Sequence, residues 1–447
     1  MVSAPSYKHI FSVAWPLGLK AMMLHGIIVI DAYLVSPLGE TALAAMGLAG
    51  AIAGMMLGVL FAFSSGTQIR LARGFGSGGK LPMKTGFYAG LVQNLLAAAV
   101  GLGLVLAFGP QAITSMAQTP WIAEQAQSYL NVMLLVVFSE AVGQCISSFF
   151  NANGKTRVPF LGYLIGLPVN VSVSLLLIHG HWGFPALGVQ GAAVGTLCGS
   201  LARLAFLGLI FLRETGFYRD VAGWAQGNFK ASLRRHMVFT WPIAGTFVSM
   251  TIANQVFLLI GTDLGVNAFA ALTLILPWVV VLGTFGMAWA QAVGIIAAQM
   301  LGQGAGHAAL DAFVSRAFRG AFIAAGIVAV VNSGLVLCSG WIYDDLQSET
   351  KAALWTFLPV LFLLPFPKGS NAICGQTLRA AGDTVYVMNL FIGAQWLVKV
   401  PFAALFVFVW DMSVTWVFAL MLLDEIVKLV PFHARFFKGV WKDAKDV

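Results

Sequence analysis

The chain has 447 residues, of which 59% are hydrophobic and 9% are charged, and its formal net charge is +8. Soluble domains carry about 25% charged residues, so this composition excludes an ordinary soluble protein and indicates a membrane protein. A positive charge can also mark nucleic-acid binding, but no nucleic-acid motif accompanies it. There is also no Walker motif or catalytic triad, so we expect neither ATP-driven transport nor an enzyme.

Apolar runs long enough to cross a bilayer, about 20 residues each, recur along the whole chain. They predict an all-α integral membrane protein with twelve transmembrane helices. The predicted spans are 11–35, 43–69, 86–109, 125–150, 158–178, 188–212, 237–262, 268–300, 315–341, 351–378, 385–409 and 413–437.

An internal repeat organises these spans. Trp15-Pro16 returns as Trp241-Pro242, and the same offset aligns Leu38-Gly39 with Leu264-Gly265. The offset is half the chain, so we predict two six-helix lobes related by pseudo-two-fold symmetry. Two equivalent membrane halves are the layout of many secondary transporters, which bind their substrate between the halves.

The predicted domains follow from this repeat. They are an N-terminal lobe at 1–212, a cytoplasmic linker at 213–236, and a C-terminal lobe at 237–447 with a short cytoplasmic tail. The linker is the one extended polar connection, and we interpret it as an interfacial amphipathic helix anchored by Phe217, Tyr218 and Trp224.

Basic residues gather in the loops on one side of the predicted topology, the side that also holds both termini. By the positive-inside rule that side is cytoplasmic. We therefore expect a multi-pass protein of the cell (inner) membrane. Its expected partners are a small-molecule substrate and membrane lipid, with no nucleic acid, and we expect a monomer.

Asp31 stands in the first apolar segment, and its repeat partner is Phe257, so this ionisable group is not duplicated. A charge at mid-membrane costs at least a few kcal/mol and usually marks function. A carboxylate there can take up a proton or hold a sodium ion. The alternative is a structural carboxylate bonded to a neighbouring helix.

Two basic residues also lie in spans of the first half. Lys20 precedes Asp31 by eleven residues, or about three helical turns, so both face the same direction. Lys20 either belongs to the same site or snorkels toward the cytoplasm. We expect Arg203 to lie near the cytoplasmic end of span 6 and to snorkel.

Span 4 carries a polar stripe, in which Gln144, Ser147 and Asn151 follow Glu140 at i+4, i+7 and i+11. Such a stripe lies on one helix face and is expected to face a partner helix or a wet cavity rather than lipid. Glu140 is thus a second candidate carboxylate, with a structural hydrogen bond as the alternative.

Neutral oxygens are available close to the coupling candidate. Asn170 and Ser174 stand one turn apart on span 5, and Thr196 stands on span 6. Each can be an ordinary interhelical hydrogen bond, but together with a carboxylate they are the donors that a proton or sodium site needs.

The second half is basic in its spans, because Lys368 and Lys399 both stand in apolar runs. Asp424 and Glu425 lie in span 12, with Lys428 at i+4 and i+3, and we predict that these three pair with one another as a structural set.

Several segments resemble the multidrug and toxic compound extrusion (MATE) family from the first span to the last. They are Pro16 with an Asp fifteen residues on, LGETALAAMGLAG (38–50), GTQIRLARGFGSG (66–78), FFNANGKTRVPF (149–160), ALGVQGAAVGT (186–196) and LRAAGDT (378–384). The resemblance implies a twelve-helix, two-lobe exporter of organic compounds, driven by proton or sodium antiport through alternating access. It implies no cofactor and no metal other than a coupling Na⁺ at Asp31.

By this resemblance Asp31 matches the family's cation-coupling aspartate, and Asn170 and Thr196 match its polar partners. Ser174 stands where part of the family has a second Asp. Met250 and Lys368 replace acids that some members carry in the second lobe. Coupling is therefore expected at Asp31, with either ion open.

The expected client is an amphipathic organic cation, which a carboxylate beside aromatic walls binds well. Candidates for the substrate cavity are Glu140, Gln144, Lys368, Lys399, Phe150 and Trp278. The lysines keep two alternatives open, namely export of an organic anion and flipping of a lipid-linked precursor. A major facilitator transporter is disfavoured, because the loop LARGFGSGGK (71–80) lacks the Asp of that family's signature.

Overall fold

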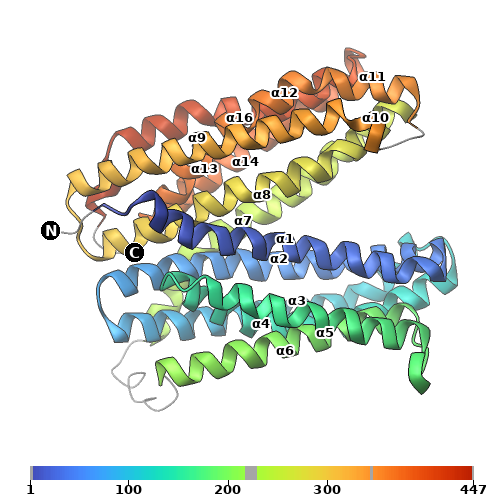
Figure 1. Ribbon diagram of the computed structural model, residues 1–447, viewed down its shortest axis with the longest axis horizontal. Helices are drawn as coiled ribbons and strands as arrows, with labels where there is room; N and C mark the ends of the chain where they lie inside the picture. Colours follow the sequence, from blue (N-terminus) through green and yellow to red (C-terminus); the bar gives the residue numbers. More distant parts are fainter. Residues whose placement is uncertain (1–3, 217–228, 343–345, 445–447) are drawn as a thin grey trace. The chain divides into compact units, whose positions relative to one another are not determined.

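The computed structural model describes residues 4–216, 229–342 and 346–444, and among these it contains helices and turns but no strand (Figure 1). The first half contains α1 (Tyr7–Val35), α2 (Glu40–Gly76), α3 (Lys80–Met116), α4 (Pro120–Ala152), α5 (Arg157–His179) and α6 (Val189–Thr215). The second half contains α7 (Phe229–Gly261), α8 (Val266–Gly302), α9 (His307–Leu337), α10 (Ser339–Ile342), α11 (Ser348–Thr356), α12 (Leu358–Leu363), α13 (Pro365–Ala380), α14 (Thr384–Gly393), α15 (Val400–Ala404) and α16 (Val414–Phe437). The fold class is all-α and transmembrane, as predicted.

The duplicated half is visible in the bounds of the helices. Helices α2 and α8 are both 37 residues long, and the offset that relates Trp15 to Trp241 also relates their first residues and their last residues. The glycine before each helix also has a positive φ, 99° at Gly39 and 88° at Gly265. L-residues rarely adopt such a backbone, so both copies need glycine at the same turn. The predicted repeat is confirmed.

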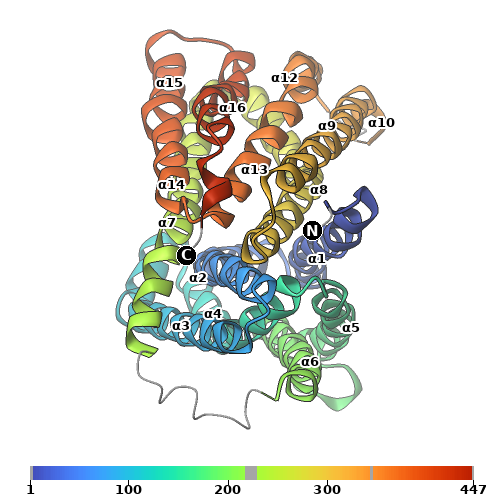
Figure 2. The same ribbon diagram turned by 90° about the vertical axis from the view of Figure 1, so that its left-hand side faces the viewer.

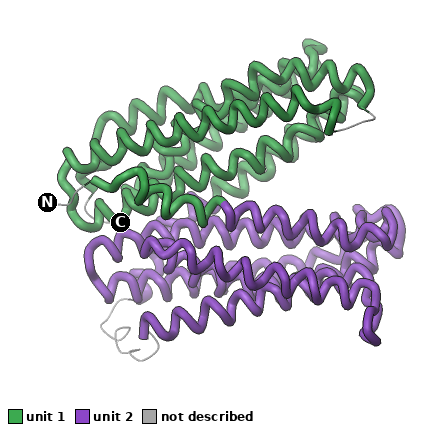
Figure 3. Tube along the Cα trace, viewed as in Figure 1, with its two compact units in different colours: residues 1–18, 245–447 green, residues 19–244 purple. Residues whose placement is uncertain are grey.

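The described helices divide into two compact units, one of Met1–Gly18 with Gly245–Val447 and one of Leu19–Ala244 (Figure 3). The predicted lobes divide between 212 and 237, whereas these units divide inside α1 and α7. The two dividing points, Gly18 and Ala244, are equivalent positions of the repeat. The middle of the predicted linker, 217–228, lies outside the described residues, as do its predicted anchors.

Hydrogen bonds show why the first parts of α1 and α7 group in this way. In the unit Leu19–Ala244, Thr240 at the start of α7 bonds with Gln93 of α3 at 2.7 Å. In the other unit, Arg316 of α9 donates to the backbone carbonyls of Ala4 and Pro5 at 2.7 and 2.9 Å. Each half therefore supplies the start of its first helix to the other unit.

Ten helices among the described residues are long and apolar enough to cross a membrane. The predicted span 351–378 is not one straight helix. It is broken into Ser348–Leu363 and Pro365–Ala380 with a bend of 41°, because Pro365 has no N–H to continue the ladder. The predicted span 385–409 contains π-helical segments at Ala394–Lys399 and Leu405–Val409. Helix α16 (Val414–Phe437) covers the twelfth predicted span, 413–437, but is not among these ten.

Small side chains bring the helices of the first half close together. Ala42, Ala45, Ala49 and Ala53 recur at helical spacing on α2 and are buried, and α2 packs along α4 (Figures 1 and 2). Membrane helices associate through such small-residue seams, since lipid removes the hydrophobic drive between helices. Such close packing leaves few positions for polar side chains between the helices. The candidate site consists of polar side chains at such positions.

Candidate functional site

Asp31 is buried on α1 with 5% of its surface exposed. Thr196 of α6 donates its hydroxyl to Asp31 Oδ2 at 3.1 Å. Asn170 of α5 in turn donates its side-chain amide to Thr196 Oγ1 at 3.1 Å. The structure thus brings three of the four predicted coupling residues into one hydrogen-bonded chain across α1, α5 and α6.

Ser174, the fourth predicted residue, lies one turn beyond Asn170 and is fully buried. Three oxygens of this set have no hydrogen-bond partner among the described residues, namely Asp31 Oδ1, Asn170 Oδ1 and Ser174 Oγ. Asp31 also makes no ion pair there. Buried acceptors without a donor are rare, so this group of oxygens has the chemistry to accept a proton or a small cation.

Glycines on α6 allow α5 to come near enough for these bonds. A Cβ at Gly195 would collide with the side chain of Ser174 and would lie 2.8 Å from the carbonyl oxygen of Asn170. A Cβ at Gly199 would lie 2.7 Å from the carbonyl oxygen of Gly166. The absence of side chains at Gly195 and Gly199 therefore sets the distance between Asn170 and Thr196.

Glu140 forms an ion pair with Arg203, and Gln144 donates to the second carboxylate oxygen of Glu140 at 3.0 Å. The guanidinium of Arg203 lies 4.3 Å from the ring centroid of Tyr163. The expectation that Arg203 snorkels is wrong, because its side chain is 2% exposed and is neutralised inside the unit. Glu140 is consequently not a lone carboxylate, although it was a candidate for attracting a cation.

Lys20 belongs to the same cluster. It is 6% exposed, and its ammonium lies 5.7 Å from the ring centroid of Tyr163. No hydrogen bond or ion pair of this ammonium is present among the described residues. The cluster therefore holds two cations, Lys20 and Arg203, against the single carboxylate of Glu140.

Two more residues of the polar stripe on α4 contact neighbouring helices, as predicted, whereas Ser147 donates to the carbonyl of Gly143 on its own helix. Asn151 donates to Gln68 Oε1 of α2 at 2.8 Å, and Gln144 also reaches the hydroxyl of Tyr163 on α5 at 3.3 Å. Phe150 is 0% exposed and packs edge-on against Phe149. In this structure Phe150 offers no surface to a substrate, because the close packing that buries the stripe also covers its ring.

In the other unit, α16 carries the predicted structural set. Lys428 Nζ contacts Asp424 at 2.9 Å and Glu425 at 3.0 Å. Glu425 also accepts from the amide of Asn371 on α13 at 2.9 Å. The prediction of local pairing is confirmed, with one lysine shared between the two carboxylates on the same helix.

Lys399 lies in the π-helical part of its span and is buried. Its ammonium donates to Asn254 Oδ1 at 2.8 Å and lies 4.6 Å from the ring centroid of Phe257. Phe257 is the repeat partner of Asp31. The position that holds a carboxylate in the first half therefore holds an aromatic ring in the second half, and the ammonium of Lys399 lies over that ring. Lys399 is held by these contacts.

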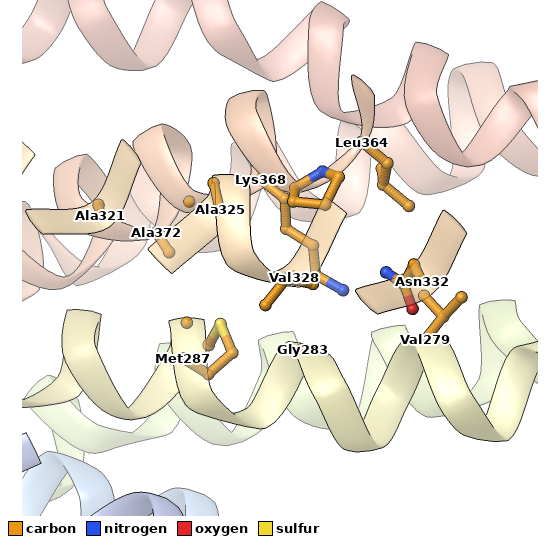
Figure 4. Close-up of a pocket in the computed structure, with 13 residues that line it drawn as sticks. Val279, Gly283, Met287, Ala321, Ala325, Val328, Asn332, Leu364, Lys368 and Ala372 are labelled. Atoms are coloured by element: carbon orange, nitrogen blue, oxygen red, sulfur yellow. The ribbon is translucent and has the colours of Figure 1, made fainter. Parts of the chain in front are cut away.

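Lys368 lines a pocket between α8, α9 and α13 (Figure 4). The other lining residues are Val279, Gly283, Gly286, Met287, Ala321, Ala325, Val328, Asn332, Leu364, Pro365, Gly369 and Ala372. Trp278, the aromatic candidate on α8, lies in a separate smaller hollow beside Leu335 and Ser339. Lys368 and Trp278 are thus not brought together.

Sequence reasoning missed two polar residues of these sites. Arg203 was interpreted as a topological charge, and Asn332 in span 9 was not considered. The signal that singled out Asp31, a polar side chain inside an apolar run, applies equally to Asn332. The partner of Arg203 could not be read from spacing, because Glu140 stands on another helix.

The comparisons with known proteins agree across the whole chain. The model of the family described as MatE matches residues 16–176 and 242–405, and the two matches begin at equivalent positions of the repeat. An uncharacterized transporter, YisQ of Bacillus subtilis, is 22% identical over 97% of this chain and 94% of its own. A multidrug resistance protein, NorM of Burkholderia vietnamiensis, is 24% identical over 87% and 84%.

Solved structures show the same fold. The crystal structure of MATE in a bent conformation superposes with a TM-score of 0.85 at 19% identity, covering 98% of this chain and 96% of that chain. An outward-facing multidrug resistance MATE transporter gives a TM-score of 0.83 at 19% identity, covering 98% and 97%. Because the family model matches both halves and most of their length, the chain belongs to the MATE family of multidrug efflux transporters.

Proposed function

We propose that this protein is a secondary active exporter that moves organic compounds out of the cell in exchange for H⁺ or Na⁺ by alternating access. It works as a monomer in the cell (inner) membrane with both termini in the cytoplasm. The observation that carries the proposal is the buried carboxylate of Asp31, which has no cation partner among the described residues. A static structural role would not require that carboxylate to stay unpaired.

The same residues suggest how coupling works. When Asp31 is charged it accepts the hydroxyl hydrogen of Thr196, whose oxygen accepts from Asn170. A proton or Na⁺ on Asp31 neutralises that charge and weakens the bond from Thr196, so α1 is held less firmly against α6. An ion shifts a conformational equilibrium only by binding the two states unequally, and this bond is a place where the states can differ.

Two classes of transported substrate are supported by different observations. Relatives that are named multidrug resistance proteins, together with the family resemblance, support an amphipathic organic cation attracted by Asp31. The second candidate is an organic anion or a lipid-linked precursor. It is supported by the pairing of Glu140 with Arg203 and by the unpaired ammonium groups of Lys20 and Lys368.

The test is transport in proteoliposomes with proton and sodium gradients imposed separately. Asp31→Asn keeps the size and hydrogen bonding of the side chain but removes its charge. We expect export of ethidium, or of an anionic dye, to fall at least tenfold under either gradient. The apparent melting temperature in detergent should stay within a few degrees of that of the unchanged protein.

Thr196→Val is the companion variant, because it removes the hydroxyl at nearly constant volume. It should reduce the dependence of export on the ion gradient without abolishing transport. Asp31→Asn protein that exports at the unchanged rate under the same gradient would refute the proposed coupling site.

A further inference from the structure

The pocket of α8, α9 and α13 has one ionisable lining residue, Lys368, in otherwise neutral and mostly apolar walls. The ammonium of Lys368 makes no hydrogen bond or ion pair with any described residue. It lies beside Gly283, where an added Cβ would be in van der Waals contact with it at 3.6 Å. The glycine on α8 therefore leaves room next to the ammonium that a side chain would take up.

A second polar group faces the same space. Asn332 of α9 is 2% exposed, and its Oδ1 has no partner among the described residues. Figure 4 shows the amide of Asn332 and the ammonium of Lys368 turned toward the same part of the pocket. The amide of Asn332 makes no hydrogen bond with a described residue, so its N–H₂ group can donate to a ligand, whereas its Oδ1 can only accept.

The charges of this unit point to the sign of the ligand. The charged side chains that are buried in its described residues are Lys399, Lys428, Asp424 and Glu425, so two cations balance two carboxylates. Lys428 pairs with both carboxylates, and Lys399 bonds to Asn254. Lys368 adds a positive charge that this set does not compensate, and a bound monoanion would compensate it.

We propose that Lys368 and Asn332 form a binding subsite for the carboxylate of an amphipathic organic anion, whose apolar body lies against Val279, Met287 and Leu364. A carboxylate accepts from the ammonium and from the amide N–H₂ group. The subsite deepens the proposed export function, on which it rests, by naming the chemical class of one client.

The test is equilibrium binding of fluorescent naphthalene-2-carboxylate to the full-length protein in phosphatidylcholine nanodiscs, with no ion gradient. We expect saturable binding that the neutral naphthalene-2-carboxamide does not match. Lys368→Met should weaken it about tenfold or more, since a charge-assisted hydrogen bond is lost. Lys368→Arg should retain most of it. Lys351→Met, which removes an exposed lysine of the same unit, is the matched control and should bind as the unchanged protein does.

A second variant covers the case in which Lys368→Met fails to fold. Gly283→Leu keeps the lysine but fills the space above it, and it should also abolish binding. Equal affinity for the carboxylate and the carboxamide, or full affinity in folded Lys368→Met and Gly283→Leu proteins, would overturn the proposal. Displacement of the probe by phosphatidylglycerol in the nanodiscs would also overturn it, because the anion would then be a lipid phosphate.

Binding is measured without transport, so it separates the two proposals. Carboxylate binding at Lys368 in a protein whose Asp31→Asn variant still exports would refute the coupling site alone. Loss of export in Asp31→Asn, with no carboxylate binding in the unchanged protein, would refute the subsite alone.

Discussion

Charged side chains inside the spans differ chiefly in whether they have a partner. Glu140 with Arg203, and Asp424 and Glu425 with Lys428, are paired within their own units. Asp31 and Lys368 have no ion-pair partner among the residues that the structure describes. A buried pair whose charges cancel is usually structural, since separating its members costs several kcal/mol. An unpaired charge persists where something mobile, such as a proton, an ion or a ligand, can neutralise it.

The pair of Glu140 and Arg203 provides a residue-scale prediction. Glu140→Gln leaves a guanidinium that is 2% exposed without its counter-charge, so it should lower the free energy of unfolding by about 3–5 kcal/mol. The double variant Glu140→Gln, Arg203→Met removes both charges and should recover part of that loss. Thermal unfolding of the purified proteins in detergent measures this, and a fully stable single variant would contradict it.

The sequence predicted which polar residues belong to the candidate site better than it predicted which of them form hydrogen bonds or ion pairs with one another. Asp31, Asn170 and Thr196 were expected together because they match one family motif, and the structure joins them by hydrogen bonds. Local pairing on α16 was predictable, because i+3 and i+4 neighbours share a helix face. The bond between Glu140 and Arg203 was not, because 63 residues separate them and spacing does not show which helices are neighbours.

At the scale of elements, the order of the helices and their repeat followed from the sequence, whereas the full helix lengths and the breaks within spans did not. The apolar run 351–378 is continuous in composition, yet the structure bends it at Pro365. A proline can bend a membrane helix, break it or leave it straight. The outcome depends on whether neighbouring groups form a hydrogen bond with the backbone carbonyl that the proline leaves without a donor. The distance between α5 and α6 likewise depends on which glycines face the partner helix.

The contact of α5 with α6 provides the prediction at this scale. Gly195→Ala places a methyl group against Ser174 and the backbone of Asn170. The helices must separate, so overpacking should cost about 1–3 kcal/mol and should lengthen the bond between Asn170 and Thr196. Export in proteoliposomes should fall together with the melting temperature.

Gly208→Ala is the matched control for this prediction, because it lies on the same helix with nothing within 4 Å of an added Cβ. It should retain export and should be at least as stable as the unchanged protein, since alanine favours helix. If both glycine variants behaved alike, close approach at Gly195 would not be what holds the site together.

At the scale of the whole molecule, the order of charged loops predicts which ends of the helices face the cytoplasm. Ser77, between α2 and α3, lies on the predicted cytoplasmic side, and His181, after α5, lies on the outer side. Both are exposed. The four native cysteines are Cys145, Cys198, Cys338 and Cys374, and replacing them allows single cysteines to report orientation.

In a cysteine-free background, His181→Cys should react with a membrane-impermeant thiol reagent in intact cells. Ser77→Cys should react only after the membrane is permeabilised. The degree of labelling before and after permeabilisation is the measurement. The reverse pattern would invert the proposed orientation, and the positive-inside rule would then fail for this chain.

The exchange of helix starts between the units has a consequence for the origin of the chain. Residues up to Gly18 belong to the unit that the second half builds, and residues up to Ala244 belong to the unit that the first half builds. A single half could complete such a bundle by swapping this segment with a second copy, as domain-swapped dimers do. Fusion of two such copies into one chain would keep that swap. Two halves produced as separate chains would each be incomplete until they met.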